Sequence, residues 1–323
     1  IDLPFCLCWA NENWTRRWDG QDSEVLIAQV HSAADDVAMM ADVARYMRDG
    51  RYYRIGGKPL FLVYRPDILP EPRETLERWR AYCRDNGIGE IIIAAALTFG
   101  LEDPMQYGFD FGIEFPPHNL PALRQVDELT DAERFGFKGY IFDYLGYESD
   151  VLDKTYETGA AIVRTAMPGW DNTARRSGRS KIFVNATPAN YQRLLTEFVD
   201  RAQVVEGGKK PLVMINAWNE WADGAYLEPD RSYGFAFLNA TGRALGGTPY
   251  GRLLVPEDEH APDAPPGVEV RRYEITAGTS VLSVLLELGD AILDHDMILL
   301  PGGGCSEISA ESLAAALSAM HES

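Results

Sequence analysis

Residues 212–230 read LVMINAWNEWADGAYLEPD, and their order indicates the fold class. It opens with four apolar residues, Leu212 to Ile215, and continues at once into indole rings, carboxylates and amides. An apolar run without strict alternation is typical of a strand that is buried on both faces of a parallel sheet. Polar and aromatic side chains directly after such a strand are typical of the mouth of an α/β barrel.

The same order, a short apolar run followed by polar and aromatic residues, recurs along the chain. We expect six strands, at 4–9, 59–64, 90–96, 109–115, 181–186 and 212–218. Apolar residues at helical spacing lie between them, over about 35–50, 74–87, 188–198 and 235–245. Asp35 and Asp36 are suited to cap the first of these helices, and Gly87 is suited to follow the second.

This alternation of strands and helices predicts an α/β fold with a parallel sheet, and we expect a (β/α)8 TIM-type barrel. Six units against the eight of a closed barrel indicate that about the first two βα units are missing, so we expect a fragment. An open, doubly wound sheet is the alternative. The expected domains are a barrel over 1–250, a linker rich in proline and acidic residues over 251–267, and a partial second α/β unit over 268–323.

Composition excludes some partners. Lys and Arg number 30 against 49 Asp and Glu, a net charge of −19, which disfavours nucleic acid. The sequence has no uncharged apolar run of about 18 residues, so we expect no membrane segment. The four cysteines form neither a disulfide framework nor a C-x-x-C zinc pattern, which favours a reducing compartment such as the cytoplasm.

The stretch after residue 215 has the side chains that glycosyl chemistry needs. Sugar C–H faces stack on aromatic rings, while hydroxyl groups need carboxylates and amides. Cleaving or transferring a glycosidic bond also needs one group that protonates the leaving oxygen and another that acts on the sugar ring. Glu220 and Asp223 are therefore the candidate catalytic pair, although a solvated acidic turn that ends at Gly224 is the structural alternative.

Other strand ends contribute candidate substrate contacts. For each, a structural role is also open: the rings at 9–18 could be core, His118 could be a packing residue, and Arg175 and Arg176 could form surface ion pairs. The candidate substrate-binding residues are Trp9, Asn11, Glu12, Trp14, Tyr64, Arg65, Glu114, His118, Trp170, Asp171, Asn172, Trp218, Asn219, Trp221, Tyr226 and Glu228.

Five segments in this order, CWANENWTRRWDG, GKPLFLVYRP, GFDFGIEFPPH, PGWDNTARR and NAWNEWADGAYLEPD, resemble the WbsX family. This family is associated with bacterial surface-polysaccharide gene clusters and is related to glycoside hydrolase family 99. The resemblance extends from the first residue to about Gly247. It implies a (β/α)8 barrel that acts on an oligo- or polysaccharide without a cofactor or a metal.

The resemblance also implies roles for the two carboxylates. In family 99 the catalytic pair lies three residues apart in a WNEW-containing motif, which corresponds to Glu220 and Asp223 here. The implied mechanism retains the anomeric configuration: Glu220 deprotonates the sugar 2-hydroxyl to give a 1,2-anhydro intermediate, and Asp223 acts first as acid and then as base. The second carboxylate of the family is usually Glu. The shorter Asp223 is a departure, and a displacement of about 1 Å can cost on the order of 100-fold in rate. With the first strands also missing, we expect this fragment alone to be poorly folded or inactive.

Three functions stay open at this point: a retaining endo-glycosidase that cleaves bacterial polysaccharide, a glycosyltransferase of O-antigen or capsule synthesis, and a glycan-binding module without catalysis. The C-terminal region adds a D-x-D, Asp294 and Asp296, after an apolar run. This resembles the metal-binding strand of nucleotide-sugar transferases, in which two Asp residues hold a divalent ion on the diphosphate. The second unit could therefore be glycosyltransferase-like.

Overall fold

The computed structural model describes residues 2–16, 21–118, 126, 137–176, 179–247, 251–256, 268–273, 297–298 and 308–309. By its internal contacts the chain divides into two compact units, Ile1–Asp230 and Arg231–Ser323. All the candidate residues of the barrel belong to the first unit.

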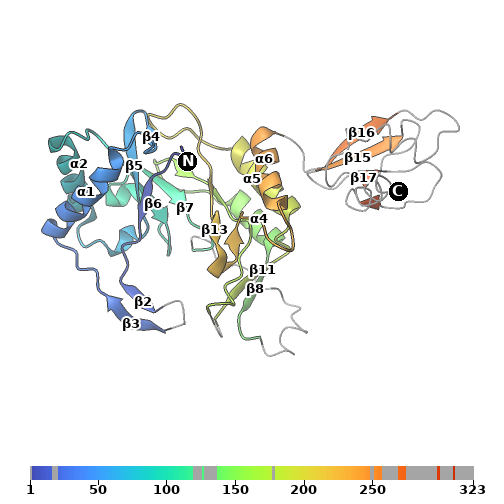
Figure 1. Cartoon of the computed structure of the whole chain (residues 1–323), viewed down its shortest axis with the longest axis horizontal. Helices are drawn as coiled ribbons and strands as arrows, with labels where there is room; N and C mark the ends of the chain where they lie inside the picture. Colours follow the sequence, from blue (N-terminus) through green and yellow to red (C-terminus); the bar gives the residue numbers. More distant parts are fainter. Residues whose placement is uncertain are drawn as a thin grey trace. The chain divides into compact units, whose positions relative to one another are not determined.

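A mostly parallel sheet forms the centre of the first unit (Figure 1). Its strands pair in the order β1 (Leu7–Trp9), β5 (Lys58–Val63), β6 (Ile92–Leu97), β7 (Phe111–Glu114) and β9 (Ile162–Val163), each parallel to the next. The short antiparallel β4 (Arg54–Ile55) forms a hairpin with the start of β5. One residue after β9 comes β10 (Thr165–Ala166), which pairs in parallel with β12 (Met214–Ile215). The expectation of an α/β fold built on a parallel sheet is confirmed, whereas closure into a barrel stays a prediction.

Two predicted strands lie outside the main sheet. The range 181–186 was expected in the main sheet, but β11 (Lys181–Val184) pairs with β8 (Tyr140–Asp143) in a separate two-stranded parallel sheet. The last strand of the main sheet is β9 instead, and β12, from the predicted strand 212–218, pairs with β10 outside that sheet. The sequence did not predict β9 and β10, because Arg164 interrupts the apolar run that contains them. In the structure this charge is balanced by Glu114, whose carboxylate lies 3.3 Å from Arg164 Nε.

Both faces of the main sheet are covered by apolar side chains, as the uninterrupted apolar runs predict. One core lies between the sheet and the helices α1 (Ala33–Met47) and α2 (Pro72–Asp85), and it includes Met40, Leu76, Trp79, Phe61 and Ile93. The other core lies on the opposite face, and it includes Leu60, Leu62, Ile92, Phe111 and Ile113. Neighbouring residues of one strand thus point into different cores, as the period of two requires.

The cap of α1 differs from expectation. Ser32, rather than Asp35 or Asp36, is the N-cap, because its Oγ accepts the backbone N–H of Asp35. Asp36 is buried instead, and its Oδ2 accepts hydrogen bonds from Thr75 Oγ1 at 2.9 Å and Arg78 Nε at 2.8 Å. The sequence places the charge correctly in the first turn, but its role is to bind α1 to α2.

The remaining elements of the first unit are α4 (Tyr144–Asp153), α5 (Pro188–Asp200), the 3-10 turns η2 (Pro66–Ile68), η3 (Pro104–Tyr107) and η4 (Trp221–Asp223), and two antiparallel hairpins. The first hairpin is β2 (Trp14–Arg16) with β3 (Gln21–Ile27), and the second is β13 (Asn219–Glu220) with β14 (Ala225–Tyr226). Each hairpin follows a parallel strand, β1 of the main sheet or β12 of the β10–β12 pair, so it lies beyond the carboxyl end of that strand.

The second unit contains α6 (Ala236–Gly246) and a small sheet. In this sheet β15 (Gly251–Pro256) pairs in parallel with β16 (Val268–Tyr273) and β17 (Met297–Ile298), and β18 (Ile308–Ser309) pairs antiparallel with β17. The range 251–256 was expected in the linker but forms β15 instead. Asp294 and Asp296 lie outside the described residues, and the predicted domain boundaries stay predictions.

Candidate active site

The candidate residues gather where the parallel strands end. In an α/β sheet, ligands bind outside the carboxyl ends of the strands. Side-chain hydrogen bonds join neighbouring strand ends there: Asn11 Nδ2 donates to the carbonyl of Arg65 at 2.7 Å, and Asn216 Nδ2 donates to the carbonyl of Pro116 at 2.7 Å. The loops after β1, β5, β7 and β12 are therefore held together in two pairs.

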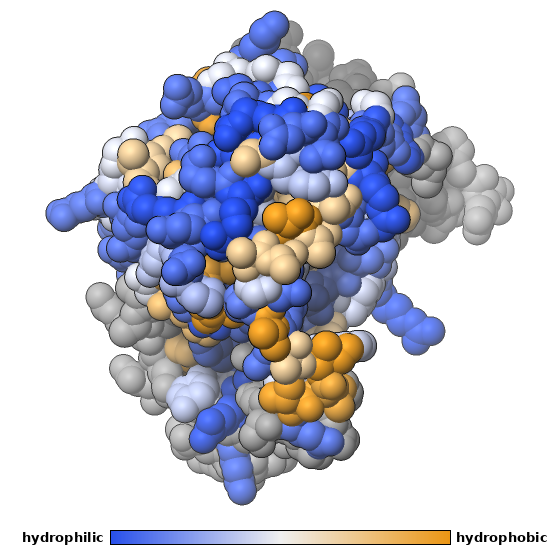
Figure 2. Space-filling model, turned by 90° about the vertical axis from the view of Figure 1, so that its left-hand side faces the viewer, coloured by the Kyte–Doolittle hydropathy of each residue, from blue (hydrophilic) through white to orange (hydrophobic). Residues whose placement is uncertain are grey.

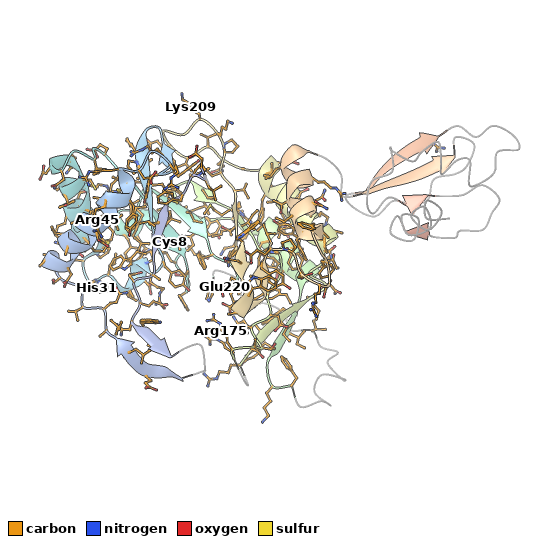
Figure 3. All side chains as sticks on the ribbon, viewed as in Figure 1. Cys8, His31, Arg45, Arg175, Lys209 and Glu220 are labelled. Atoms are coloured by element: carbon orange, nitrogen blue, oxygen red, sulfur yellow. The ribbon has the colours of Figure 1, made fainter. Side chains whose placement is uncertain are left out.

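Glu220 lies at the end of β13 and is exposed to solvent (Figure 3). Two indole rings flank it in the sequence and are about half exposed, Trp218 at 53% and Trp221 at 47%. Large exposed aromatic rings beside a carboxylate are what a sugar ring needs for stacking and hydrogen bonding. Asn219, between Trp218 and Glu220, is exposed as well.

Contacts among its own side chains stabilise the segment that contains Glu220. Trp221 stacks on Tyr226 with ring centroids 3.8 Å apart, and its Nε1 donates to Glu228 Oε2 at 2.6 Å. The Tyr226 hydroxyl donates to Asp230 Oδ2 at 2.9 Å. Three predicted contact residues, Trp221, Tyr226 and Glu228, are thus fixed to one another, which leaves the outer face of the Trp221 indole as the available surface.

Asp223 has a different environment from Glu220. It is 4% exposed, and its two carboxylate oxygens accept hydrogen bonds from Arg175, one from Nε at 2.7 Å and one from Nη2. Its backbone carbonyl also accepts the N–H of Asp171 at 2.8 Å. A bidentate arginine–carboxylate pair is among the stronger charge-assisted contacts, so Asp223 is held in one position.

The close approach of the 170s loop to this turn requires glycine at 224. Gly224 has a φ of +63°, and a Cβ there would lie 2.7 Å from the backbone nitrogen of Asp171. Glycine takes up this conformation without a steric penalty and leaves room for the neighbouring chain.

A cavity of about 540 Å³ connects the loop after β1 to Arg175. Its lining includes Glu12, Trp14, Ile27, Gln29 and Arg175. Glu12 accepts a hydrogen bond from Arg65 Nη1 at 2.7 Å, and Arg65 also binds Asp67. The lining comes from the β1 loop, the β2–β3 hairpin and the loop after β10, and Arg175 connects the cavity to Asp223, which, like Glu220, does not line it.

His118 lies in a cluster of aromatic rings. The rings of Tyr64, Phe99, Phe115 and Trp170 have centroids 5.6–6.3 Å from its imidazole. Burial, reinforced by the nearby Lys181, Arg176 and Arg175 and opposed by Asp223, lowers the pKa of His118 to about 4. The imidazole is therefore neutral at physiological pH, which suits a packing residue better than a proton donor.

Several predicted substrate contacts face protein instead. The Trp9 ring packs edge-on against His31 and Trp79 under α1 and α2. Glu114 is 2% exposed and accepts hydrogen bonds from Tyr156 Oη at 2.7 Å and from the Thr165 N–H at 3.2 Å, while its burial raises its pKa. The structure brings none of these side chains to the cavity.

Three further predicted contact residues form hydrogen bonds within and between loops and do not line the cavity. Asn11 is fully buried against the Arg65 backbone, and its Oδ1 accepts the Arg65 N–H at 2.8 Å. Asn172 is 5% exposed and accepts the N–H of Lys181 at 2.7 Å. Asp171 Oδ1 accepts from the Thr173 side chain and backbone in a local turn.

Two features of the site are not in the candidate set. Arg175 lines the cavity and binds Asp223, although the PGWDNTARR motif gave it only as a possible ion-pair partner. Ile27 and Gln29 line the cavity from the β2–β3 hairpin. Residues 21–27 read QDSEVLI, four polar residues followed by three apolar ones, so the sequence lacks the alternation that would have indicated this strand.

A larger cavity, of about 800 Å³, lies at the opposite ends of the strands, because its lining includes Asp110 just before β7 and Ala161 just before β9. None of the candidate residues lines it. Within the described part of the chain, no group of three or more His, Cys, Asp or Glu residues is placed to hold a metal ion. No helix of that part is both long and apolar enough to span a bilayer.

Two solved structures are similar to parts of the chain. One, a glycoside hydrolase-like protein, has 15% identity and a TM-score of 0.45, and the match covers 65% of this chain and 61% of that one. The other, the GH99 endo-alpha-mannosidase from Bacteroides thetaiotaomicron, has 12% identity and a TM-score of 0.33, with 68% and 65% covered. Both TM-scores are too low to establish a shared fold.

Sequence relatives are much closer. Two proteins named "Uncharacterized protein WxcX", from Xanthomonas campestris pv. campestris strains B100 and ATCC 33913, are 47% and 46% identical over 251 residues, which is 77% of this chain. The chain spans only 36% of the length of these curated relatives. The family model described as "Glycosyltransferase WbsX" matches residues 1–241, and the chain therefore belongs to the WbsX glycosyltransferase family.

Proposed function

We propose that this chain is the glycan-acting part of an enzyme that cleaves or transfers glycosidic bonds in a bacterial surface polysaccharide. Membership of the WbsX family supports a carbohydrate-active enzyme. The observation that carries the proposal is the β13–β14 hairpin, in which the exposed Glu220 lies between two half-exposed indole rings and three residues before the anchored Asp223.

Glu220 is the carboxylate that reacts with the sugar. In the retaining mechanism it takes the proton of the 2-hydroxyl, whose oxygen attacks the anomeric carbon and expels the leaving group as a 1,2-anhydro sugar forms. Asp223 gives a proton to the leaving oxygen, and later takes one from the water or hydroxyl that opens the anhydro ring, while Glu220 returns its proton to the 2-oxygen. The proton count closes, because each carboxylate returns to its starting state.

The Arg175 pair constrains the role of Asp223. A protonated Asp223 can accept fewer hydrogen bonds than the ionised form, so one of the two bonds from Arg175 has to break before Asp223 carries a proton. Arg175 therefore belongs to the machinery as a positioning residue. Substrate in the cavity that Arg175 lines is well placed to loosen this pair.

Hydrolysis and transfer use the same residues and differ in the acceptor. The name of the family favours transfer, with a glycan hydroxyl in place of water. For hydrolysis, the full-length protein is incubated with bacterial surface polysaccharides and new reducing ends are measured. For transfer, a labelled glycan acceptor and a nucleotide-sugar or glycan donor are added, and mass gain is measured.

Variants assign the residues in either assay. Glu220→Gln and Asp223→Asn should both abolish turnover, while the control Glu197→Gln, an exposed carboxylate in α5, should not change it. Glycan binding without turnover, unchanged by Glu220→Gln, would instead identify a binding module. No release and no transfer with any donor tried would reject the proposal for those glycans.

A further inference from the structure

The β2–β3 hairpin carries an apolar surface that the proposed chemistry does not use. Trp14 is 59% exposed, Val25 is 49%, Leu26 is 46% and Ile27 is 55%. Successive residues of a strand point to opposite faces, so Val25, Leu26 and Ile27 expose apolar side chains on both faces of the hairpin. Exposed apolar residues usually occur singly, and a contiguous group marks a binding surface.

Figure 2 shows a hydrophobic patch low on the face that it draws, the end of the molecule at which Figure 1 places the hairpin. The base of the hairpin is fixed to the β1 loop. The backbone N–H of Gln29 donates to Asn13 Oδ1 at 2.8 Å, and Gln29 Nε2 donates to the carbonyl of Ala10 at 3.1 Å. The apolar surface therefore has a defined position beside Glu12.

Part of this apolar surface lines the 540 Å³ cavity that Arg175 connects to Asp223. Trp14 and Ile27, which are paired across the two strands, both line it, together with Glu12 and Arg175. The cavity thus has an apolar wall from the hairpin and a charged wall from the β1 and β10 loops. A volume of about 540 Å³ lies within the range of roughly 300–1,000 Å³ that is usual for small-ligand sites.

A ligand that fits both walls has an apolar side and a hydroxylated side. The C–H face of any sugar stacks on an indole such as Trp14. The aliphatic Ile27 adds a requirement, since a hydroxyl group against it would lose water without gaining a hydrogen-bond partner. A methyl group in the same place is favoured, because burying one such carbon increases affinity by about 4-fold.

We propose that the cavity between the β2–β3 hairpin and Arg175 binds a 6-deoxy sugar residue of the glycan, with its methyl group against Trp14 and Ile27 and its hydroxyl groups toward Glu12 and Arg175. This inference rests on the proposed function, because it takes the ligand to be a glycan. It adds the class of sugar and the residues that select it.

Matched sugars test the inference by binding alone. The full-length protein is titrated with methyl α-L-rhamnopyranoside against methyl α-L-mannopyranoside, and with methyl α-L-fucopyranoside against methyl α-L-galactopyranoside; each pair differs only at the C6 hydroxyl. Saturation-transfer NMR reports affinity and the contact of each proton. In at least one pair the 6-deoxy sugar should bind about 4-fold or more tightly, with its methyl protons receiving the strongest saturation.

Variants locate the preference. Ile27→Ser should reduce it to about 1-fold, and Trp14→Ala should weaken binding of both sugars of the pair. Val37→Ser, at an aliphatic residue of α1 that is 40% exposed, is the matched control and should change neither. Equal binding within both pairs, or a preference that survives Ile27→Ser, would overturn the inference.

The two proposals fail separately. Glu220→Gln should keep the preference for the 6-deoxy sugar, since Glu220 reacts rather than selects. A preference that depends on Ile27, in a protein that neither cleaves nor transfers any glycan, supports this inference and rejects the proposed function. Turnover that depends on Glu220, without a preference for the 6-deoxy sugar, supports the proposed function and rejects this inference.

Discussion

The ion pair between Arg175 and Asp223 should stabilise the folded protein, because it holds a buried carboxylate. The Asp223 side chain is 6% exposed and that of Arg175 is 29% exposed. Arg175→Ala removes both hydrogen bonds and leaves a buried carboxylate unpaired, a change that typically costs about 3–5 kcal/mol. Because the arginine side of the pair is partly open, water can reach the carboxylate after truncation. We therefore expect a loss near the lower limit, about 3 kcal/mol in the free energy of unfolding.

Urea unfolding followed by tryptophan fluorescence measures this loss. With a slope of about 3 kcal/mol per molar urea, the midpoint should fall by about 1 M. The control is Arg45→Ala, whose ion pair with Asp42 is 67% and 61% exposed and should contribute under about 1 kcal/mol (Figure 3 labels both arginines).

A second substitution separates charge from packing. Adding Asp223→Asn to Arg175→Ala removes the unpaired charge, so the double variant should be at least about 1 kcal/mol more stable than Arg175→Ala alone. If Arg175→Ala costs no more than Arg45→Ala, or if the double variant is the less stable of the two, the description of Asp223 as a buried, arginine-held carboxylate is wrong.

Two further predictions concern the surroundings of the pair. The pKa of His118 is about 4 in the folded protein against an ordinary 6.5, so between pH 4 and 6.5 the unfolded chain binds more protons than the folded one. The free energy of unfolding should therefore be full above pH 6.5 and fall by about 3 kcal/mol as the pH drops to 4. Urea midpoints measured across this range should lose most of their pH dependence in His118→Phe. Gly224→Ala should cost more than Gly87→Ala in thermal unfolding, because both have positive φ, but only the Cβ at 224 meets the Asp171 backbone; equal costs would contradict the close approach.

The parallel sheet could be predicted largely from continuous apolar runs. β5, β6 and β7 are buried on both faces and carry little polar interruption, so their sequences indicate strands directly. β9 and β10 were not predicted, because the charged Arg164 lies between them. In the structure Glu114 balances that charge. That partner is distant in sequence, so no local pattern could show that the charge would be accommodated.

Only part of the site could be predicted, because local sequence patterns do not show which side chains face one another. Position after a strand identified the hairpin with Glu220 and Asp223, but it could not tell which side chains turn into the cavity. Trp9 ends β1 yet points to the helices, because alternate residues of a strand face opposite sides. The Arg175–Asp223 pair joins residues 48 apart in sequence, and such a contact follows from the fold rather than from spacing.

If Glu220 is the reacting carboxylate, turnover must depend on it, and the turnover of Glu220→Gln measures that dependence. Glycan release or transfer by the full-length protein is measured beside Glu197→Gln, with thermal melting to confirm folding. Because Glu220 is exposed and general acid–base groups contribute about 10²–10⁴-fold, turnover should fall at least 100-fold with an unchanged melting temperature. A folded Glu220→Gln protein that retains the turnover of Glu197→Gln would show that Glu220 is not the reacting carboxylate.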